Sequence, residues 1–293
     1  MAKKINRVVF LLNEHKAWGV KAACAAAALL EAQGVELLLP KDGELPGYSG
    51  HRPELLLADL QKLDHSLWPE LAVIFGGDGT LIAVARAISR LDIPLVGVNM
   101  GNLGFLMSLE PEGMPHNLLR LVQGEYFLEP RMQLYGRVWR NGQQIAEGVA
   151  QNDIVINNGN ISRMIDINVW IDGTLAVEMK GDGLIVATPT GSTAYSLSAG
   201  GSIVLPETEV MLITPVAAHS LYSRPMVVSA ESDIKLRVSS AADSAKISYD
   251  GQQFHDIANG DVVEVRRFEH PAIFVWPERG MFLKKLKSKL LTE

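Results

Sequence analysis

Cysteine is nearly absent from this sequence. Cys24 is the single cysteine among 293 residues, so no internal disulfide can form. It lies in the alanine-rich run 22–28, where we expect a small buried helix residue. A reactive thiol needs a polar and electropositive setting, which this run does not provide. A chain without disulfides is typical of a reducing compartment, and we expect a cytoplasmic location.

Long apolar runs and blocks of one charge are missing as well. The apolar stretch 8–12 is much shorter than the ~20 residues that span a bilayer, and it reads better as a first buried strand. The net charge of -6 is spread along the chain, whereas nucleic-acid binding needs an organised basic surface. We therefore expect neither a membrane nor a nucleic acid as partner, while a small phosphorylated molecule remains open.

Three common ligand motifs are absent too. No Gly-x-x-x-x-Gly-Lys-Ser/Thr sequence occurs, which excludes a P-loop enzyme. The dinucleotide fingerprint Gly-x-Gly-x-x-Gly fails, because Gly77 and Gly79 are followed by Ile82 where the third glycine belongs. No histidines and cysteines cluster with metal-ligand spacing. Any phosphate site must therefore use a different glycine loop.

The first part of the chain, residues 1–124, alternates strand and helix patterns. We expect strands at 8–12, 35–39, 71–75 and 94–98, and helices at 19–33, 54–63 and 80–90. This alternation predicts an α/β domain with a parallel sheet covered by helices. Ligands of such domains bind beyond the carboxyl ends of the strands.

Residues 125–293 have a different sequence pattern, in which short strand-like runs are separated by turns. We expect strands at 133–140, 153–157, 165–171, 184–188, 210–214, 234–238 and 262–267. The dipeptides Asn141-Gly142 and Asp172-Gly173 suit tight hairpins. The sequence thus predicts a β-rich second domain with a boundary near Gly124. The basic amphipathic stretch 282–290 is a candidate to pack back on the first domain.

The first motif that carries chemistry is Gly76-Gly77-Asp78-Gly79-Thr80, between a predicted strand and a predicted helix. The glycines allow close approach of a bulky anion and present amides to phosphate oxygens. Thr80 is expected to cap the helix, whose positive end also favours phosphate. Asp78 can accept a hydrogen bond from a substrate hydroxyl and take its proton during phosphoryl transfer. The alternative is an ordinary Gly-Asp turn.

The second motif is the segment 181–201, in which an apolar strand runs into a hydroxyl-rich loop bounded by glycines. Ser192, Thr193, Ser196 and Ser198 offer short donors and acceptors, and Tyr195 offers a face on which a base can stack. These hydroxyl groups and this aromatic ring suit the binding of the ribose and adenine of a nucleotide. The alternative is a serine-rich turn that caps a helix.

Taken together, these segments resemble one family of kinases. The Gly-Gly-Asp-Gly-Thr sequence is shared by NAD kinases, diacylglycerol-type lipid kinases and phosphofructokinases, and it does not choose among them. Segment 181–201 looks like the signature of NAD kinases specifically, and the stretches 99–106 and 151–153 resemble further parts of that family. The resemblance covers the chain from about Gly76 to Gly251.

The resemblance implies transfer of a phosphoryl group from ATP to the 2′-hydroxyl of the adenosine ribose of NAD, with Asp78 as proton acceptor. It also implies a divalent cation, Mg²⁺, and homodimers or homotetramers. Phosphate would contact Gly76, Gly77, Gly79 and Thr80. The implied NAD contacts are Asp78, Gly79, Asn152, Asp153, Arg163, Lys180, Asp182, Thr193, Ala194, Tyr195, Ser196, Leu197, Ser198, Ala217 and Gln252.

Two positions depart from the family pattern. Asp153 stands where relatives carry Glu, and Lys180 stands where many carry Arg, which replaces a planar fork by a point charge. The choice between NAD and NADH is therefore open, as is that between ATP and polyphosphate. Asn152-Asp153 and Asp250-Gly251 also fit a plain turn and a plain hairpin. A lipid or sphingoid-base kinase and a dinucleotide-binding regulator without activity are the alternatives.

Overall fold

The computed structural model describes residues 3–12, 17–38, 48–49, 64–101, 104–159, 164–220, 223–239 and 245–290. The chain divides into two compact units. The first comprises Met1–Pro130 and Ala272–Glu293, and the second Arg131–Pro271. The helix expected at 54–63 and the candidate contact Arg163 lie outside the described residues.

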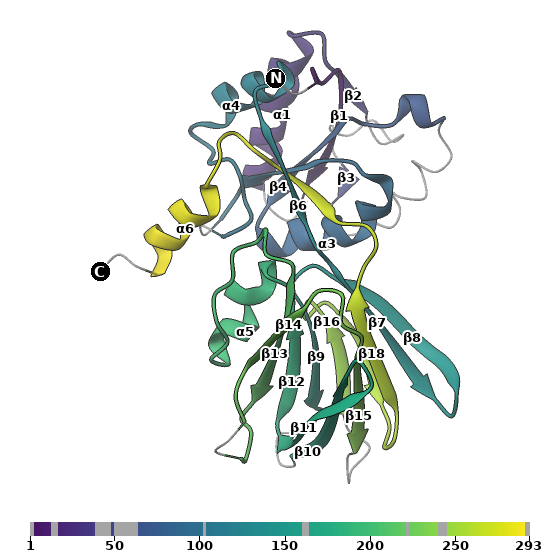
Figure 1. The fold of residues 1–293 in the computed structure, drawn as a ribbon. Helices are drawn as coiled ribbons and strands as arrows, with labels where there is room; N and C mark the ends of the chain where they lie inside the picture. The colour runs from purple at the N-terminus through teal and green to yellow at the C-terminus, as the bar shows by residue number, and fades with distance from the viewer. Residues whose placement is uncertain are drawn as a thin grey trace. The chain divides into compact units, whose positions relative to one another are not determined.

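The first unit is built on a seven-stranded sheet with the order β2-β1-β4-β5-β19-β6, in which β3 also pairs with β1. Figure 1 labels β1, β2, β3, β4 and β6 of this sheet. Its strands are β1 (Arg7–Leu12), β2 (Glu36–Leu38), β3 (Tyr48–Ser49), β4 (Leu71–Gly76), β5 (Leu95–Asn99), β6 (Phe127–Arg131) and β19 (Ala272–Trp276). β1 pairs in parallel with β2, β3 and β4, and β5 pairs in parallel with β4 and β19. The predicted parallel sheet of an α/β unit is thus confirmed.

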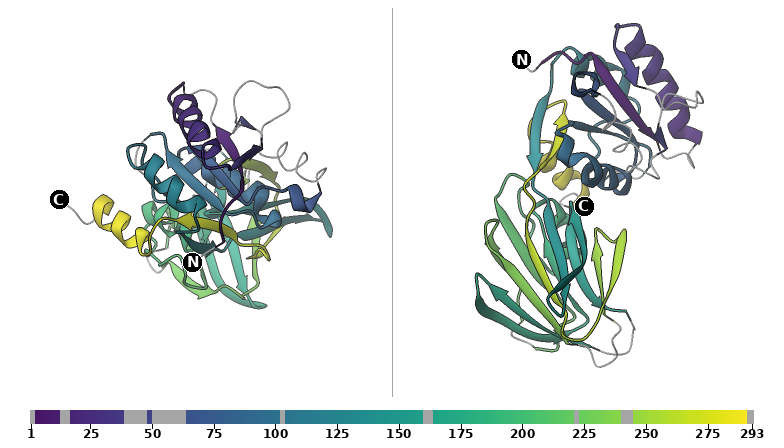
Figure 2. Two further views of the ribbon diagram at one scale, coloured as in Figure 1. Left: turned by 90° about the horizontal axis from the view of Figure 1, so that it is seen from above. Right: turned by 90° about the vertical axis from the view of Figure 1, so that its right-hand side faces the viewer.

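Helices cover both faces of this sheet, which explains why its strands are apolar on both sides. Val8 and Phe10 of β1 pack in one core with α1 (Ala17–Glu31) and α4 (Met114–Val122). Val9 and Leu11 belong to the opposite core, which contains residues of α3 (Asp78–Ile88). Figure 2 shows the ribbon from two further sides. Short 3₁₀ turns follow at His65–Leu67 and Ser89–Leu91, and α6 spans Met281–Leu290. Cys24 lies in α1 but is exposed, so the expectation of a buried thiol is wrong.

The second unit consists of two antiparallel six-stranded sheets with the orders β11-β10-β15-β18-β7-β8 and β14-β13-β12-β9-β16-β17. The first of these sheets contains β7 (Leu134–Arg140), β8 (Gln143–Ala150), β10 (Ile165–Ile171), β11 (Thr174–Gly181), β15 (Ile234–Ser239) and β18 (Val262–Arg267). The second contains β9 (Asp153–Asn158), β12 (Gly183–Ala187), β13 (Val210–Val216), β14 (Met226–Ser229), β16 (Ala245–Tyr249) and β17 (Gln253–Ile257). The predicted β-rich second part is confirmed.

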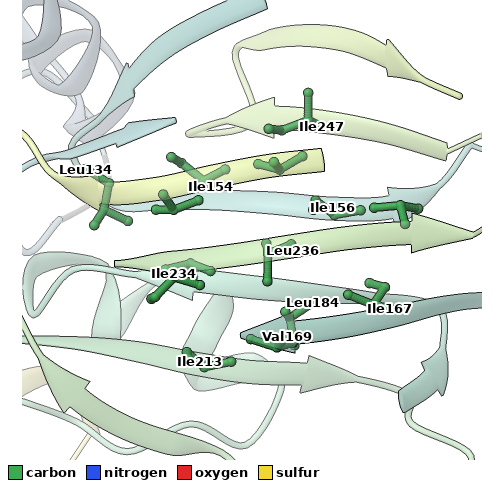
Figure 3. Close-up of a cluster of buried hydrophobic side chains, with 14 of the residues drawn as sticks. Leu134, Ile154, Ile156, Ile167, Val169, Leu184, Ile213, Ile234, Leu236 and Ile247 are labelled. Carbon is green, nitrogen blue, oxygen red and sulfur yellow. The ribbon is translucent and has the colours of Figure 1, made fainter. Parts of the chain in front are cut away.

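The core of the second unit lies between its two sheets (Figure 3). Ile167 and Leu236 enter it from one sheet, and Ile154 and Leu184 from the other. β12 is buried on both faces, because Ile185 belongs to a smaller apolar cluster on the outer side of its sheet. The chain that follows β12 contains the 3₁₀ turn η3 (Thr190–Thr193) and the short helix α5 (Tyr195–Ser198). A near-continuous apolar run at 184–187 is the sequence signature of such a doubly covered strand.

The two hairpin turns predicted at Asn141-Gly142 and Asp172-Gly173 are present in the structure. Asn141, Asp172 and the glycine that follows each of them have positive φ, as the tight turns of hairpins require. The observed units differ from the predicted division at 124/125, because the first unit extends to Pro130 and regains the chain from Ala272 onward. Within the described residues, no helix is both long and apolar enough to cross a bilayer.

We expect Leu184→Ala to lower the free energy of unfolding of the second unit by about 2–5 kcal/mol, because Leu184 is fully buried and its removal leaves a cavity. The matched control is Leu175→Ala, which truncates a leucine that is 44% exposed on β11 and should change stability by no more than ~0.5 kcal/mol. Urea unfolding followed by circular dichroism measures both. Equal losses in the two variants would contradict the described core.

Candidate functional site

Asp78 opens helix α3 directly after the buried strand β4. The helix begins two residues earlier than predicted, because Thr80 and Leu81 donate their backbone amides to the carbonyl of Gly77, at 3.0 and 3.1 Å. Gly77 is the N-cap and makes no side-chain capping bond, so the expectation that Thr80 caps the helix is wrong. A carboxylate in the first helical turn is favoured by the positive end of the helix dipole.

Gly76 lets the chain turn closely from β4 into α3. A Cβ atom at this position would lie 2.8 Å from Oγ1 of Thr80, and so only glycine fits without a shift. The start of an eleven-residue helix at the carboxyl edge of a parallel sheet directs backbone amides towards that edge. This is a favourable setting for an anion such as phosphate.

The carboxylate of Asp78 is held by the backbone that follows β5. The amide of Phe105 donates to Oδ2 at 2.7 Å, and the amide of Leu106 lies 3.3 Å from both carboxylate oxygens. A Cβ atom at Gly104 would stand 1.9 Å from Oδ1, so glycine is required there. Oδ2 is therefore the anchored oxygen, and Oδ1 keeps the greater freedom to accept another hydrogen bond.

The segment that holds Asp78 is itself anchored in the first unit. The Asn99 side chain donates to Glu110 Oε2 at 3.0 Å and accepts from the amide of Gly101 at 3.2 Å. Ser108 donates to the carbonyl of Val275 at 2.7 Å. The family-like stretch 99–106 is thus in direct contact with Asp78. Sequence reasoning noticed this stretch but assigned no role to its residues, although the glycine at 104 was a signal of close approach.

In the second unit, Asp250 organises the chain at the start of β9. Its carboxylate accepts the amides of Gln151 at 2.9 Å, Asn152 at 2.7 Å and Asp153 at 3.1 Å. Asp250 and Gly251 both have positive φ in the turn between β16 and β17. The hairpin reading of this dipeptide is therefore correct, and its aspartate also fixes the Asn-Asp pair.

Asp153 is a buried carboxyl group, with 5% of the residue exposed. Burial, and to a lesser extent the negative charge of Asp250, raise the pKa of Asp153 from 3.8 to about 7. A carboxyl group in this state carries a proton over much of the range in which most carboxyls are ionised. It can therefore donate a hydrogen bond below neutral pH.

The turn after β12 packs against the same Asn-Asp pair. The amide of Thr188 donates to the carbonyl of Asn152 at 2.8 Å, and its hydroxyl donates to the carbonyl of Gln151 at 2.7 Å. A Cβ atom at Gly191 would stand 2.1 Å from the carbonyl oxygen of Asn152. The structure thus brings 151–153, 188–191 and Asp250 together at one end of the second unit.

The hydroxyl groups of the 192–198 segment have different surroundings. Ser196 is fully buried and its Oγ lies 2.8 Å from Oγ1 of Thr214, while Ser192 bonds the backbone of Val204. These two hydroxyls therefore order the loop from within. Tyr195 is 44% exposed at the start of α5. Further exposed or half-exposed members are Thr193, Ala194, Leu197 and Ser198. Gln252 is exposed beside the Asp250 turn.

Arg131 was not singled out from the sequence. It is buried, and its Nη1 donates to Thr190 Oγ1 at 3.2 Å in the turn that precedes α5. An arginine at the end of a short edge strand carries no distinctive signal in one sequence. The structure adds it as a residue that supports the hydroxyl-rich turn.

Lys180, Asp182 and Ala217 lie at the other end of the same unit. Asp153 pairs with Ala187 at one end of β12, whereas Asp182 lies just beyond the opposite end of that strand, five residues or about 17 Å from Ala187 at ~3.4 Å per residue. All three residues are exposed, and Nζ of Lys180 lies 3.9 Å from Oδ2 of Asp166. The structure therefore separates the predicted NAD contacts of the second unit into two groups, which sequence order could not reveal.

No group of three or more His, Cys, Asp or Glu side chains in the described ranges is arranged to hold a metal ion. The amides and hydroxyls around Asp78 and around Asn152 are the polar groups available to a ligand.

Comparison with known proteins identifies both parts of the chain. Residues 60–126 match the model of the ATP-NAD kinase N-terminal domain, and residues 151–276 match that of the ATP-NAD kinase C-terminal domain. NAD kinase of Thiobacillus denitrificans is 39% identical over 221 residues, which are 75% of this chain and 76% of the relative. NAD kinase of Yersinia pestis is 40% identical over 235 residues, which are 80% of this chain and 78% of the relative.

Two solved structures share the fold. A yeast NADH kinase complexed with NADH has a TM-score of 0.80 at 24% identity, covering 99% of this chain and 88% of its own. An NAD kinase from Archaeoglobus fulgidus in complex with ATP has a TM-score of 0.74 at 26% identity, covering 96% of this chain and 99% of its own. These relatives do not favour the alternative of a lipid kinase. The chain belongs to the NAD kinase family.

Proposed function

We propose that Asp78 accepts the proton of the acceptor hydroxyl in the reaction of this NAD kinase, the transfer of a phosphoryl group from ATP to the 2′-oxygen of the adenosine ribose of NAD. The observation that carries this proposal is the anchored carboxylate at the start of α3, with Oδ2 bound by the amide of Phe105 at 2.7 Å. A base must be held within hydrogen-bond reach of the proton that it abstracts. Two backbone amides hold this carboxylate without help from a mobile side chain.

The chemical step follows from that arrangement. Oδ1 of Asp78 accepts the 2′-hydroxyl proton while the ribose oxygen forms a bond to the γ-phosphorus of ATP. The bond from that phosphorus to the bridging oxygen breaks, and ADP leaves with its electron pair. The products are NADP and ADP, and the proton passes from Asp78 to solvent. Catalysis of this kind depends mainly on positioning and on stabilising charge.

The phosphate groups of ATP are assigned to the glycine turn, with Gly76, Gly77, Gly79 and Thr80 as its residues. The N-terminal amides of α3 support this assignment, because such amides favour phosphate. We propose Mg²⁺ as the divalent cation of the reaction. Mg²⁺ commonly binds through substrate phosphates together with one or two carboxylates. When bound, the cation would neutralise charge on the transferred group.

NAD is assigned to the group of residues around Asn152 in the second unit, together with Asp78 and Gly79. The close packing of 151–153 against 188–191 supports a rigid polar surface there. The proposed contacts from this group are Asn152, Asp153, Thr193, Ala194, Tyr195, Leu197, Ser198 and Gln252. Ser196, whose hydroxyl is buried, is reassigned to ordering the loop.

Lys180, Asp182 and Ala217 form the second group, and we propose that they reach NAD from a neighbouring copy of the chain. Their position at the far end of β12, with Asp182 about 17 Å from Ala187 at ~3.4 Å per residue, supports this reading over a shared pocket within one copy. A homodimer or homotetramer is therefore part of the proposal, as is a location in the cytoplasm. Sedimentation analysis with and without NAD tests the assembly.

Asp78→Asn should retain the fold, because the amide oxygen of Asn still accepts from Phe105 and Leu106. It should lose about 10²–10⁴-fold in turnover, the usual effect of removing a general base. NADP formation is measured with an NADP-specific dehydrogenase. The control Asp92→Asn, at an exposed left-handed position that Asn tolerates, should have normal turnover. Near-normal turnover in Asp78→Asn would remove Asp78 from the mechanism.

An NAD analogue with 2′-deoxyadenosine should bind and inhibit competitively against NAD, yet accept no phosphate. Most dinucleotide contacts remain, and the loss of one hydrogen bond to a charged carboxylate weakens binding by roughly 1.5–3 kcal/mol. Mass spectrometry of the reaction mixture detects any phosphorylated analogue. Its appearance would show that a different hydroxyl of NAD reacts.

Asp153 should make stability depend on pH. Its folded-state pKa of about 7 exceeds the ordinary 3.8, so the folded chain binds more protons between these values and the free energy of unfolding falls as pH rises through them. At ~1.36 kcal/mol per unit the full effect is on the order of 4 kcal/mol. Asp153→Asn should flatten this slope between pH 5 and 8 in urea unfolding.

The matched control for that experiment is Asp166→Asn, which changes a carboxyl side chain that is 55% exposed in the same unit. It should keep the slope of the parent chain. If Asp153→Asn also keeps the full slope, the buried carboxyl does not titrate near neutral pH.

A further inference from the structure

Helix α6 carries one lysine that is turned away from solvent. Lys285 is only 5% exposed, whereas Lys284 and Lys287 on the same helix are exposed. Lysines are almost never fully buried unless they are paired, because an unpartnered ammonium in an apolar setting is strongly unfavourable. The burial of this side chain therefore calls for specific partners.

Those partners are backbone carbonyls of the segment 104–107. The ammonium of Lys285 donates to the carbonyl of Gly104 at 3.2 Å and also to the carbonyl of Met107. Hydrogen bonds from a charged donor are roughly twice as strong as neutral ones. The carbonyls of this segment thus point to Lys285, while its amides point to the carboxylate of Asp78.

Helix α6 also packs on the same segment through contacts with the ring of Phe105. The rings of Phe105 and Phe282 have centroids 6.0 Å apart, and Nζ of Lys289 lies 4.8 Å from the Phe105 ring. Phe282, Lys285 and Lys289 are spaced by three and four residues, so they share one face of the helix. That face contacts Gly104, Phe105 and Met107 of the segment.

The charges around Lys285 also connect it to the site. Burial lowers the pKa of the Lys285 ammonium, Lys289 adds to that effect, and the negative charges of Asp78 and Glu110 oppose it. The ammonium therefore lies within the field of the carboxylate that receives the substrate proton. Nζ is also 5.8 Å from the Trp276 ring centroid, on the strand that leads into α6.

We propose that Lys285 is a positioning residue of the kinase site, which fixes segment 104–107 from α6 and through that segment fixes the carboxylate of Asp78. This inference rests on the proposed role of Asp78 as base. It gives the C-terminal helix a function: the helix locks the loop whose amides orient the base. Without the ammonium, the carbonyls of 104 and 107 lose their charged donor and the loop can shift.

The test is Lys285→Met, which keeps most of the side-chain volume but removes the donor and the charge. We expect kcat for NADP formation to fall by about 10- to 100-fold, since misplacing a catalytic group by about 1 Å can cost ~100-fold. The KM values for ATP and NAD should change by less than about threefold, because the affected interaction acts on the chemical step. Lys285→Arg should recover most of the kcat, as it retains a charged donor.

Lys284→Met on the exposed side of α6 is the matched control, and its kcat and KM should equal those of the parent chain. Lys285→Gln, which keeps a donor without charge, should show the same loss confined to kcat if the methionine variant does not fold. A parent-like kcat in Lys285→Met or Lys285→Gln overturns the proposal, and so does an equal loss in Lys285→Arg. Asp78→Asn measured alongside separates the two ideas: high activity there overturns the base, whatever Lys285 does.

Discussion

A carboxylate that accepts two backbone amides joins two segments of the first unit. Asp78 belongs to the turn from β4 into α3, and Phe105 and Leu106 belong to the chain that follows β5. The contact is so close that residue 104 must be glycine. Lys285 then holds the same segment from the opposite side. Apart from the side chains of Asp78 and Lys285, all groups in these hydrogen bonds are backbone amides or carbonyls. The orientation of the Asp78 carboxylate therefore depends on the backbone conformation of residues 104–107.

In the second unit, too, an aspartate carboxylate accepts several backbone amides, but here it also perturbs a neighbouring carboxyl group. Asp250 accepts three successive amides and thereby fixes Asn152 and Asp153 at the start of β9. Burial, reinforced by the negative charge of Asp250, raises the pKa of Asp153 to about 7. Asp153 thus lies deep in the unit, close to the like charge of Asp250. The residue that we propose as an NAD contact is thus a buried carboxyl group whose pKa is raised towards neutral pH.

The sequence was sufficient for the fold class and the family, because glycine-flanked motifs and apolar strands depend on local constraints. It was less reliable where non-local contacts decide. The start of α3 at Asp78 depends on which carbonyl takes the first helical bonds, and so Thr80 was wrongly expected to cap the helix. Cys24 was misplaced because an alanine-rich helix has no clear apolar face. The burial of Lys285 depends on a loop that lies about 180 positions earlier, as reflected in its bond to Gly104, with a sequence separation of 181.

Hydrogen exchange at the amides of Phe105 and Leu106 tests most directly whether Asp78 is held by this segment. The two amides should exchange at least ~10-fold faster in Asp78→Ala than in the parent chain, because a hydrogen bond to a charged group contributes ~1.5–3 kcal/mol. The amide of Val84, buried within α3, should exchange at an unchanged rate and so report that the helix is intact. Unchanged exchange at Phe105 and Leu106 would contradict the account, since the carboxylate would then not be what holds the loop.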